Sequence, residues 1–458
     1  MTSQMVEIHT PDLKWWLAHL ENDFHPVHSV DLFVNTLKRR SVRNPTPTAV
    51  GTAQLLLRLI AAQKPASIQG LVDYVLSLET KLSQARPREM SIRNMVRRVL
   101  GIIREEAENA GLGEHFKAAM EMSEAAARSE LPHNRPSSSG RPALMTSHTS
   151  FASGTQASVT GLFSIISQSA SPHAMSTGTS PSGTGTNTPV QLTAVSAESF
   201  KTPTQQKDIR PAVIQDIKEL VDELESSEMS IAEYAPQLIH KNEVIMTYGL
   251  PSTVHRLLLR AAHKRDHDFT VVVVEGSQNI FKRTHAAVMN KIPATSQDDA
   301  ADITITDTAT ARKSLQDRGV QVIVISDVDI YNLISRVNKV FLAATYVLAD
   351  GSVLATSGAL NVARAAKALM KPVVVVAGSH VLCPVTSYYQ EGLVEMGPPA
   401  AIGYERGELL DADYPNPLVD LIEPQFVTMF VTNNGIVSKT TINRATLDLY
   451  HMPEADLV

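Results

Sequence analysis

Two polar residues near the middle of the chain follow an apolar run and could take part in ligand binding. Residues 320–325 are mostly apolar, which predicts a buried strand, and Ser326 and Asp327 follow directly. Open α/β sheets place ligand-binding groups at this end of their strands. Ser and Asp are also common helix N-caps, so a capping role explains them equally well.

A thiol and an imidazole also lie close together, in His380-Val-Leu-Cys383. A cysteine nucleophile needs a base of this kind, but a lone cysteine is more often an inert core residue, and that role is favoured here. Cys383 is the one cysteine of the chain, which excludes an internal disulfide and a multi-cysteine zinc site.

Known catalytic and nucleotide-binding motifs are missing. The sequence has no GxxxxGK[ST], no GxGxxG after a strand, no HExxH and no GxSxG. These absences argue against a P-loop, a dinucleotide turn, a zinc hydrolase and an α/β-hydrolase. We therefore predict no catalytic residue, no metal and no cofactor.

Arginines gather on the clearest helix of the first third, residues 91–110. Met95, Val99 and Ile103 lie on its apolar stripe, whereas Arg97 and Arg104, seven residues apart, lie on the opposite face. This face could be a basic surface for a partner, although an ordinary solvated helix face explains the pattern better.

Composition limits the class of protein. The 458 residues carry a net charge of −6, which gives no electrostatic footprint for nucleic acid. The apolar runs are far shorter than the roughly 20 residues of a membrane helix. We therefore expect a soluble, cytosolic protein.

The chain divides into segments of different pattern. Residues 1–130 have helical periodicity almost throughout, and residues 131–206 are rich in Ser, Thr, Gly and Pro, which predicts a disordered linker. Residues 207–241 predict a connecting helix. Residues 242–458 alternate apolar strands with helix-length segments, which indicates a mostly parallel, Rossmann-like sheet covered on both faces. An acidic, Thr-rich run at 293–309 is interpreted as a loop insertion.

Several longer stretches carry a family resemblance. NEVIMTYG, SRVNKVFLAATYVLADGSVLATSGA and FVTMFVTN in the α/β half, with NMVRRVLGIIREE in the helical half, resemble the beta-subunit family of eukaryotic translation initiation factor 2B. That factor reloads initiation factor 2 with GTP. The resemblance covers both predicted domains but not the linker or residues 298–308.

The resemblance also implies a test for catalysis, because sugar-phosphate isomerases share this fold. They use a cysteine after the first strand, an aspartate after the fourth and an arginine after a strand-ending glutamate. Here Gly249, Thr345 and Gly276 occupy these positions, so we expect no isomerase activity. What remains would be a vestigial pocket, formed by Gly249, Glu275, Ser326, Asp327, Thr345 and Asp350. An isomerase with relocated groups and a small-molecule sensor are the alternatives.

The resemblance further implies a regulatory subunit in a decamer of two alpha, beta, gamma, delta and epsilon subunits. Exchange activity would belong to epsilon, and the α/β domain would pair with delta. The helical domain would help to bind initiation factor 2 and to detect phosphorylation of its alpha subunit in the integrated stress response. The partner-binding candidates are Arg97, Arg98 and Arg104, and the subunit-interface candidates are Asn242, Thr270, Tyr331, Asn332 and Arg336. Neither nucleic acid nor a membrane is expected as a direct partner.

Overall fold

The computed structural model describes ten stretches of the chain: 13–22, 25–39, 42, 44–62, 67–130, 208–263, 268–276, 308–387, 390–397 and 415–450. Two predicted segments lie outside the described residues: the linker 131–206, and residues 293–307 of the insertion. Thr308 begins a helix. The described residues up to Arg128 and from Asp208 onward belong to one compact unit.

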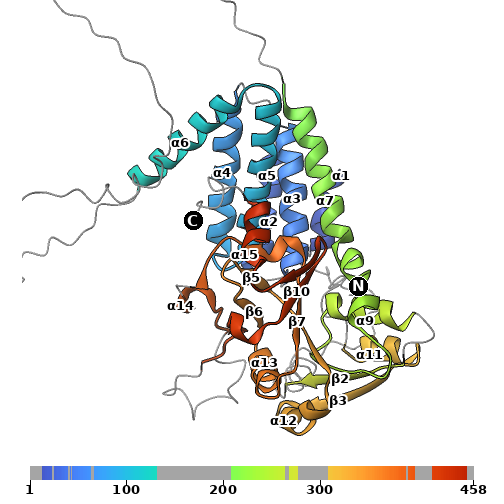
Figure 1. Ribbon diagram of the computed structural model, residues 1–458. Helices are drawn as coiled ribbons and strands as arrows, with labels where there is room; N and C mark the ends of the chain where they lie inside the picture. Colours follow the sequence, from blue (N-terminus) through green and yellow to red (C-terminus); the bar gives the residue numbers. More distant parts are fainter. Residues whose placement is uncertain are drawn as a thin grey trace, which may run out of the picture. The chain divides into compact units, whose positions relative to one another are not determined.

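A bundle of helices forms the first half (Figure 1). Its members are α1 Leu13–Asn22, α2 Pro26–Lys38, α3 Pro45–Ala62, α4 Ile68–Ala85, α5 Met90–Asn109 and α6 Gly113–Glu130. Trp16 and Phe33 stack with ring centroids 4.5 Å apart, and the apolar stripes of the helices meet in one buried core. Prolines at the starts of α2 and α3 suit the first turn, where a helix does not need their missing N–H.

The predicted connecting helix is a full member of this bundle. Helix α7, Arg210–Ala232, packs beside α3 and α5, and its Val213, Ile217 and Leu224 are buried in the same core. The last turn of α7 and the short α8, Ala235–Leu238, lead into the α/β half, where Ile231 joins the core of that half. One helix therefore contributes side chains to the cores of both halves.

The α/β half is built on a sheet of seven described strands. These are β1 Val244–Tyr248, β2 Thr270–Glu275, β3 Gln321–Ser326, β4 Lys339–Ala343, β7 Val373–Val376, β10 Met429–Thr432 and β11 Gly435–Ser438. Their order is β11-β10-β7-β4-β1-β2-β3, and every pair is parallel except β10 with β11. Counted along the chain, the parallel strands lie in the 3-2-1-4-5-6 order of a doubly wound sheet, with its switch point between β1 and β4.

Helices cover both faces of this sheet. On one face α9 Ser252–Ala262 and α11 Thr308–Gln316 pack against Ile245, Val271 and Phe341. On the other face α12 Ile330–Leu333 and α13 Ala359–Ala368 share a core with Met246, Val272 and Val340, and α15 Ile442–Leu449 contacts the edge strand β11. Alternate residues of the inner strands thus enter two different cores, which explains their continuous apolar runs. The buried strand predicted at 320–325 is present as β3, but its burial was wrong, because β3 is an edge strand of the described sheet and is largely exposed. The predicted Rossmann-like, mostly parallel architecture is confirmed.

A second, smaller sheet was not predicted. Its described strands are β5 Tyr346–Leu348, β6 Val353–Thr356, β8 Leu382–Cys383 and β9 Val419–Ile422, in the order β8-β5-β6-β9. Strands of two to four residues are too short for periodicity to reveal them. This sheet contacts both the helical bundle and the main sheet, because β8 touches α5 and β6 touches β4. No helix in the described ranges combines the length and the apolar character that a membrane span requires.

Candidate functional site at the carboxyl ends of the central strands

Most of the predicted pocket residues do gather at one edge of the main sheet. Gly249 follows β1 directly and Thr345 follows β4 by two residues, so both flank the switch point. Glu275 ends β2 and is paired in register with Ser326, which ends β3 and precedes Asp327. These are the positions at which doubly wound sheets hold ligands, as the sequence predicted.

The side chain of Tyr248 occupies this crevice. A Cβ placed on Gly276, just after β2, would lie 2.6 Å from the Tyr248 hydroxyl oxygen, and a Cβ on Gly358, before α13, would overlap the same phenol. Both neighbours are glycines, so their backbones can approach the ring this closely. Burial, followed by the charges of Asp327 and Asp420, raises the pKa of Tyr248 to about 12. Tyr248 is thus a neutral plug in the crevice.

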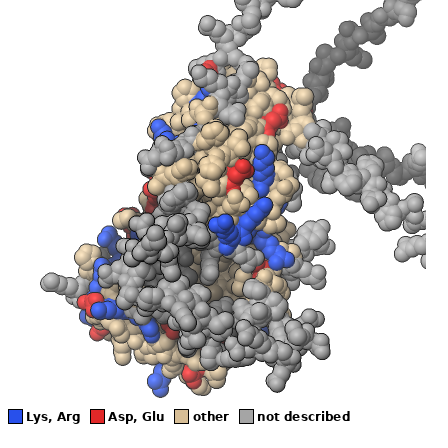
Figure 2. All heavy atoms as spheres, turned by 180° about the vertical axis from the view of Figure 1, so that it is seen from behind, with Lys and Arg blue, Asp and Glu red and all other residues tan. Residues whose placement is uncertain are grey.

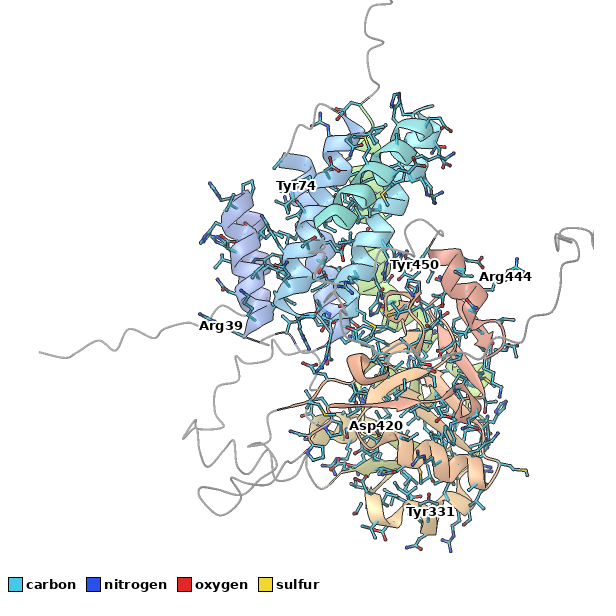
Figure 3. All side chains as sticks on the ribbon, turned by 90° about the vertical axis from the view of Figure 1, so that its left-hand side faces the viewer. Arg39, Tyr74, Tyr331, Asp420, Arg444 and Tyr450 are labelled. Atoms are coloured by element: carbon cyan, nitrogen blue, oxygen red, sulfur yellow. The ribbon has the colours of Figure 1, made fainter. Side chains whose placement is uncertain are left out.

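A carboxylate occupies the anion-binding end of helix α13. Asp420 Oδ2, from β9, accepts hydrogen bonds from the Gly358 N–H at 2.7 Å and the Leu360 N–H at 3.2 Å. Figure 3 shows Asp420 within the α/β half. Free N–H groups at a helix start bind phosphate readily. Here the protein supplies its own anion, and this role of Asp420 had no sequence signal.

The remaining acidic groups make the crevice unfavourable for a phosphate. Glu275 Oε1 and Asp327 Oδ1 are buried and have no hydrogen-bond partner among the described residues. Burial raises the pKa of Asp327, because the charged carboxylate is poorly solvated there. A sugar phosphate entering beside these two groups and Asp420 would bring like charge next to like charge.

One predicted pocket residue lies elsewhere. Asp350 is in the turn between β5 and β6, where its carboxylate accepts hydrogen bonds from the Ser352 N–H at 2.9 Å, the Ser387 N–H at 3.2 Å and the Ser387 hydroxyl. Gly351, with φ of +83°, completes the turn. The placement of Asp350 in the crevice was wrong, because β5 and β6, which the sequence did not reveal, carry it into the second sheet.

The thiol and imidazole near residue 380 lie in the contact between the two halves. Asn94 Nδ2, on α5, donates to the His380 carbonyl at 3.0 Å, to the Leu382 carbonyl at 3.1 Å and to Cys383 Sγ at 3.2 Å. His380 Nε2 lies 2.9 Å from the Thr46 hydroxyl rather than bonding to the thiol. Burial raises the pKa of Cys383 to about 12, so the thiol stays protonated and inert.

A second polar cluster, centred on Glu223, joins α7 to α5 and to the α/β half. The Glu223 carboxylate receives hydrogen bonds from Arg98 on α5 at 2.7 Å, from the Ser379 hydroxyl at 2.8 Å and from Asn433 Nδ2 at 3.0 Å. Burial raises the pKa of Glu223, but the hydrogen bonds and the Arg98 charge outweigh it, and the net pKa is lowered. In the sequence Glu223 was one of many outward acidic residues.

The three candidate arginines are not an open basic surface. Arg97 is only 3% exposed, so the expected solvated face is wrong for this residue. Arg98 pairs with Glu223, and Arg104 lies 3.7 Å from Glu108 and 3.6 Å from Glu105. Arg97 lies near Glu79 of α4 and near Tyr450 and Cys383 of the α/β half, whereas Arg98 faces α7, so the face that looked solvent-exposed in the sequence is covered from more than one side.

The five interface candidates lie at two different ends of the sheet's strands. Asn242, with φ of +60°, and Thr270 are at the amino ends of β1 and β2, and the Thr270 hydroxyl donates to Gln321 Oε1 at 3.3 Å. Tyr331, Asn332 and Arg336 are exposed along α12 and the 3-10 turn Ile334–Arg336 that follows it. Metal-binding clusters of three or more His, Cys, Asp or Glu are absent from the described ranges.

Comparison with known proteins agrees with the motif resemblance. A sequence model of the initiation factor 2 subunit family matches residues 41–301 and 306–439. Translation initiation factor eIF2B subunit beta of Schizosaccharomyces pombe is 29% identical over 431 residues, which cover 93% of this chain and 96% of that protein. The protein of the same name from Dictyostelium discoideum is 33% identical over 244 residues, covering 53% and 56% of the two chains.

Solved structures share the fold. The crystal structure of eIF2B beta from Chaetomium thermophilum has a TM-score of 0.61 at 23% identity, with 97% of this chain and 98% of that one covered. A chain of the tetrameric eIF2B-beta2-delta2 complex from C. thermophilum has a TM-score of 0.60 at 23% identity, with 96% of this chain and 100% of that one covered. With the family model matching most of its length, the chain belongs to the initiation factor 2 subunit family.

Proposed function

We propose that this chain is a non-catalytic, regulatory subunit of the translation initiation factor 2B complex, in the position of the beta subunit. The names of the two curated relatives support this position, and one of them matches over almost the whole of both chains. Within the complex, exchange of guanine nucleotide belongs to the epsilon subunit, and this chain contributes to assembly and regulation.

The observation that carries the non-catalytic role is the plugged crevice. Tyr248 lies against Gly276 and Gly358, and Asp420 occupies the start of α13. Gly249 has no side chain, and Thr345 does not titrate near neutral pH, so neither can transfer a proton as an isomerase requires. The same plug disfavours a small-molecule sensor at this position.

The α/β half pairs with the homologous half of a delta subunit in this proposal. One solved structure with the same fold is a beta2-delta2 tetramer. The margin at β3 is suited to such pairing, because β3 is the edge strand of the main sheet in the described residues. Apolar side chains are exposed along it and just beyond: Ile323 at 39%, Val324 at 40%, Val328 at 83% and Tyr331 at 63%. Exposed apolar groups of this density mark interaction surfaces.

Four of the five predicted interface residues lie near this margin. Thr270, on β2, is bonded to Gln321 at the start of β3, whereas Asn242 precedes the central strand β1 by two residues. Asn332 and Arg336 continue the exposed side of α12 beyond Tyr331. The proposal assigns these five residues to contacts with other subunits of the complex.

The helical half helps to bind initiation factor 2 and to detect phosphorylation of its alpha subunit in the cytosol. The alpha and gamma subunits complete the complex with delta and epsilon. Arg97, Arg98 and Arg104 contribute indirectly to this role, by fixing α5 against its neighbours through burial and ion pairs.

Co-expression with the delta-type subunit of the same organism tests the pairing. We expect a stable assembly with the wild-type chain and its loss with Ile323→Arg, because a charge would be buried in the interface. Ile436→Arg is the matched control, since Ile436 is 41% exposed on β11 at the opposite edge of the sheet. Equal assembly of both variants would refute the proposed margin.

Enzyme assays test the non-catalytic role separately. Ribose-1,5-bisphosphate and methylthioribose-1-phosphate are incubated with the purified chain, and we expect no turnover above the protein-free rate. Saturable turnover of either sugar phosphate would overturn this part of the proposal, whatever the outcome of the pairing experiment.

A further inference from the structure

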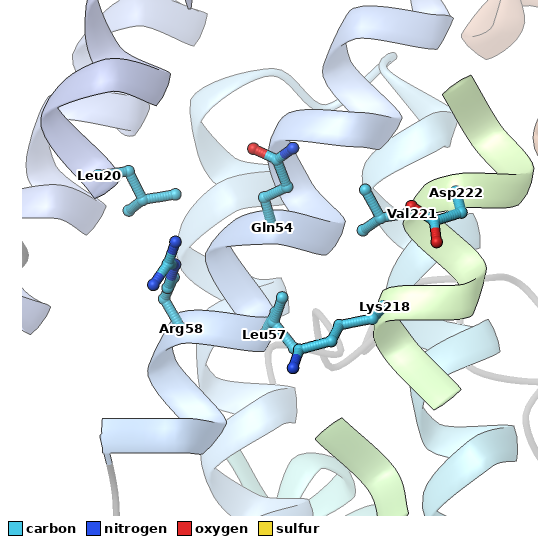
Figure 4. Close-up of a pocket in the computed structure, with 7 residues that line it drawn as sticks. All are labelled: Leu20, Gln54, Leu57, Arg58, Lys218, Val221 and Asp222. Carbon is cyan, nitrogen blue, oxygen red and sulfur yellow. The ribbon is translucent and has the colours of Figure 1, made fainter. Parts of the chain in front are cut away.

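A small groove lies between three helices of the bundle, away from the crevice. It has a volume of about 120 Å³ and is lined by α1, α3 and α7 (Figure 4). Leu20, Leu57 and Val221 supply apolar walls, and the polar lining is Gln54, Arg58, Lys218 and Asp222. Segments about 160 residues apart in the sequence thus build one concavity, because α7 packs on α3.

The two cationic side chains that line the groove, Arg58 and Lys218, differ in ion pairing from the arginines of α5. Arg93, Arg98 and Arg104 each lie within 4 Å of a glutamate. Arg58 and Lys218 are exposed, and no ion pair is formed by either of them within the described part of the chain. Their charges are therefore available to an incoming anionic group.

The size of the groove selects the kind of occupant. Sites for cofactors and drug-sized ligands are about 300–1,000 Å³, whereas an apolar cavity of about 150 Å³ holds a benzene molecule. A volume of about 120 Å³ therefore suits a single aliphatic or aromatic side chain. Asp222 lies on the same rim, and it would repel the closely spaced phosphates of a nucleic acid.

We propose that this groove is a docking site for a protein partner, into which a short acidic segment inserts one apolar side chain. The apolar side chain contacts Leu20, Leu57 and Val221, and flanking carboxylates pair with Arg58 and Lys218. Asp222 accepts a backbone N–H of the same segment. This site goes beyond the proposed function, which names no residue of α1, α3 or α7 as a partner contact.

Fluorescence anisotropy of a labelled peptide tests the site on the full-length chain. The probe is the peptide Gly-Asp-Glu-Leu-Asp-Glu-Gly. The control peptide has glycine in place of leucine. Arg58→Glu and Lys218→Glu reverse the two groove charges. Lys81→Glu is the control, because Lys81 is exposed on α4 outside the groove and makes the same charge change. Thermal melts establish that each variant is folded.

We expect saturable binding of the leucine peptide, weakened about tenfold or more by each groove reversal, which corresponds to about 1.4 kcal/mol. The control should stay within about twofold, and the glycine peptide should bind about tenfold more weakly. Three results would each overturn the proposal. These are no saturable binding up to about 1 mM peptide, equal loss in the Lys81→Glu control, and displacement of the peptide by a uridine oligonucleotide that binds more tightly.

Discussion

The Arg98 guanidinium and the Glu223 carboxylate form an ion pair, with Nη2 and Oε2 2.7 Å apart, that joins α5 to α7. The same carboxylate accepts hydrogen bonds from Ser379 and Asn433 of the α/β half. One acidic side chain thus links the helical bundle, the long helix and the α/β half. A regulatory subunit without catalysis depends on such links, because its function lies in how its surfaces are held relative to each other.

Removing the charge of Glu223 should loosen this link. Glu223→Gln loses the ion pair and weakens the bonds to Ser379 and Asn433, at a cost of about 2 kcal/mol in the free energy of unfolding. Denaturant unfolding of the full chain measures the effect. Glu225→Gln, an exposed position on the same helix, should change stability by less than about 0.5 kcal/mol. Equal effects at the two positions would contradict the role of Glu223.

His380 should make the chain less stable below neutral pH. Burial, with a contribution from the Arg98 charge, lowers the pKa of His380 from 6.5 to about 4 in the folded state. The unfolded state therefore binds more protons between these values, and stability falls as the pH drops through this window, by up to about 1.4 kcal/mol per pH unit. His380→Gln should flatten this dependence and His28→Gln, at an exposed position, should leave it unchanged. An unaltered pH profile in His380→Gln would show that the imidazole is not buried as a neutral group.

Asp420 should be replaceable by a free anion at the start of α13. Asp420→Ala loses the cap of the Gly358 and Leu360 N–H groups, which costs about 1 kcal/mol. Inorganic phosphate should then raise the melting temperature of the variant above its value in chloride at equal ionic strength. The wild type and Asp317→Ala, an exposed position, should show a smaller rise, because phosphate also stabilises folded proteins by being excluded from their surface. An equal rise in the wild type and in Asp420→Ala would contradict the role of Asp420.

Cys383 should be almost unreactive in the folded chain. Its thiol is fully buried and its pKa is raised to about 12 by burial. Reaction with a disulfide reagent at pH 8 should be at least about a thousandfold slower than for a cysteine introduced by Ser438→Cys at an exposed position, because the chain must open first. Rapid labelling of Cys383 in the folded wild type would contradict its place in the contact between the halves.

Replacing Met370 with glycine should increase the stability of the chain. Its φ is +53° just beyond the end of α13. There the Met370 N–H donates to the Lys367 carbonyl, and the Lys371 N–H donates to the Ala366 carbonyl. A side chain in this left-handed position is strained, so Met370→Gly should stabilise the chain by about 0.5 kcal/mol after the entropy cost of glycine. Met370→Ala retains the strain and should bring no gain. Thermal unfolding distinguishes the two, and a loss of stability in the glycine variant would contradict this account.

Apolar periodicity predicted most of the main sheet because its strands are four to six residues long and its inner strands are buried on both faces. The strand that the sequence predicts at residues 339–343 has the observed bounds of β4. The strand that it predicts at residues 243–247 is observed one residue later, as β1 Val244–Tyr248, which moves Tyr248 from the loop into the end of the strand. The second sheet escaped prediction because its strands are too short to show a period. Long helices were predicted from their apolar stripes. The sequence did not predict which helix covers which face of its neighbours. The burial of Arg97 under its neighbours follows from that packing alone.

The crevice was predicted in part. The end of a predicted strand indicated Ser326 and Asp327, and the resemblance to the isomerases added Gly249, Glu275 and Thr345. The structure brings these five together because parallel strands share one carboxyl edge. The plug was not predicted, because Tyr248 fits only where Gly276 and Gly358 come close from distant parts of the sequence. Asp420 likewise reaches α13 from β9, 60 residues beyond Leu360. Contacts of this kind depend on the folded arrangement and leave no local pattern.

Gentle affinity purification of the chain from its own cells, followed by native mass measurement and identification of the bound proteins, tests the central claim most directly. We expect four different co-purifying subunits in an assembly with two copies of each, together with smaller amounts of initiation factor 2. A homodimer or homohexamer of this chain without other subunits would contradict the account.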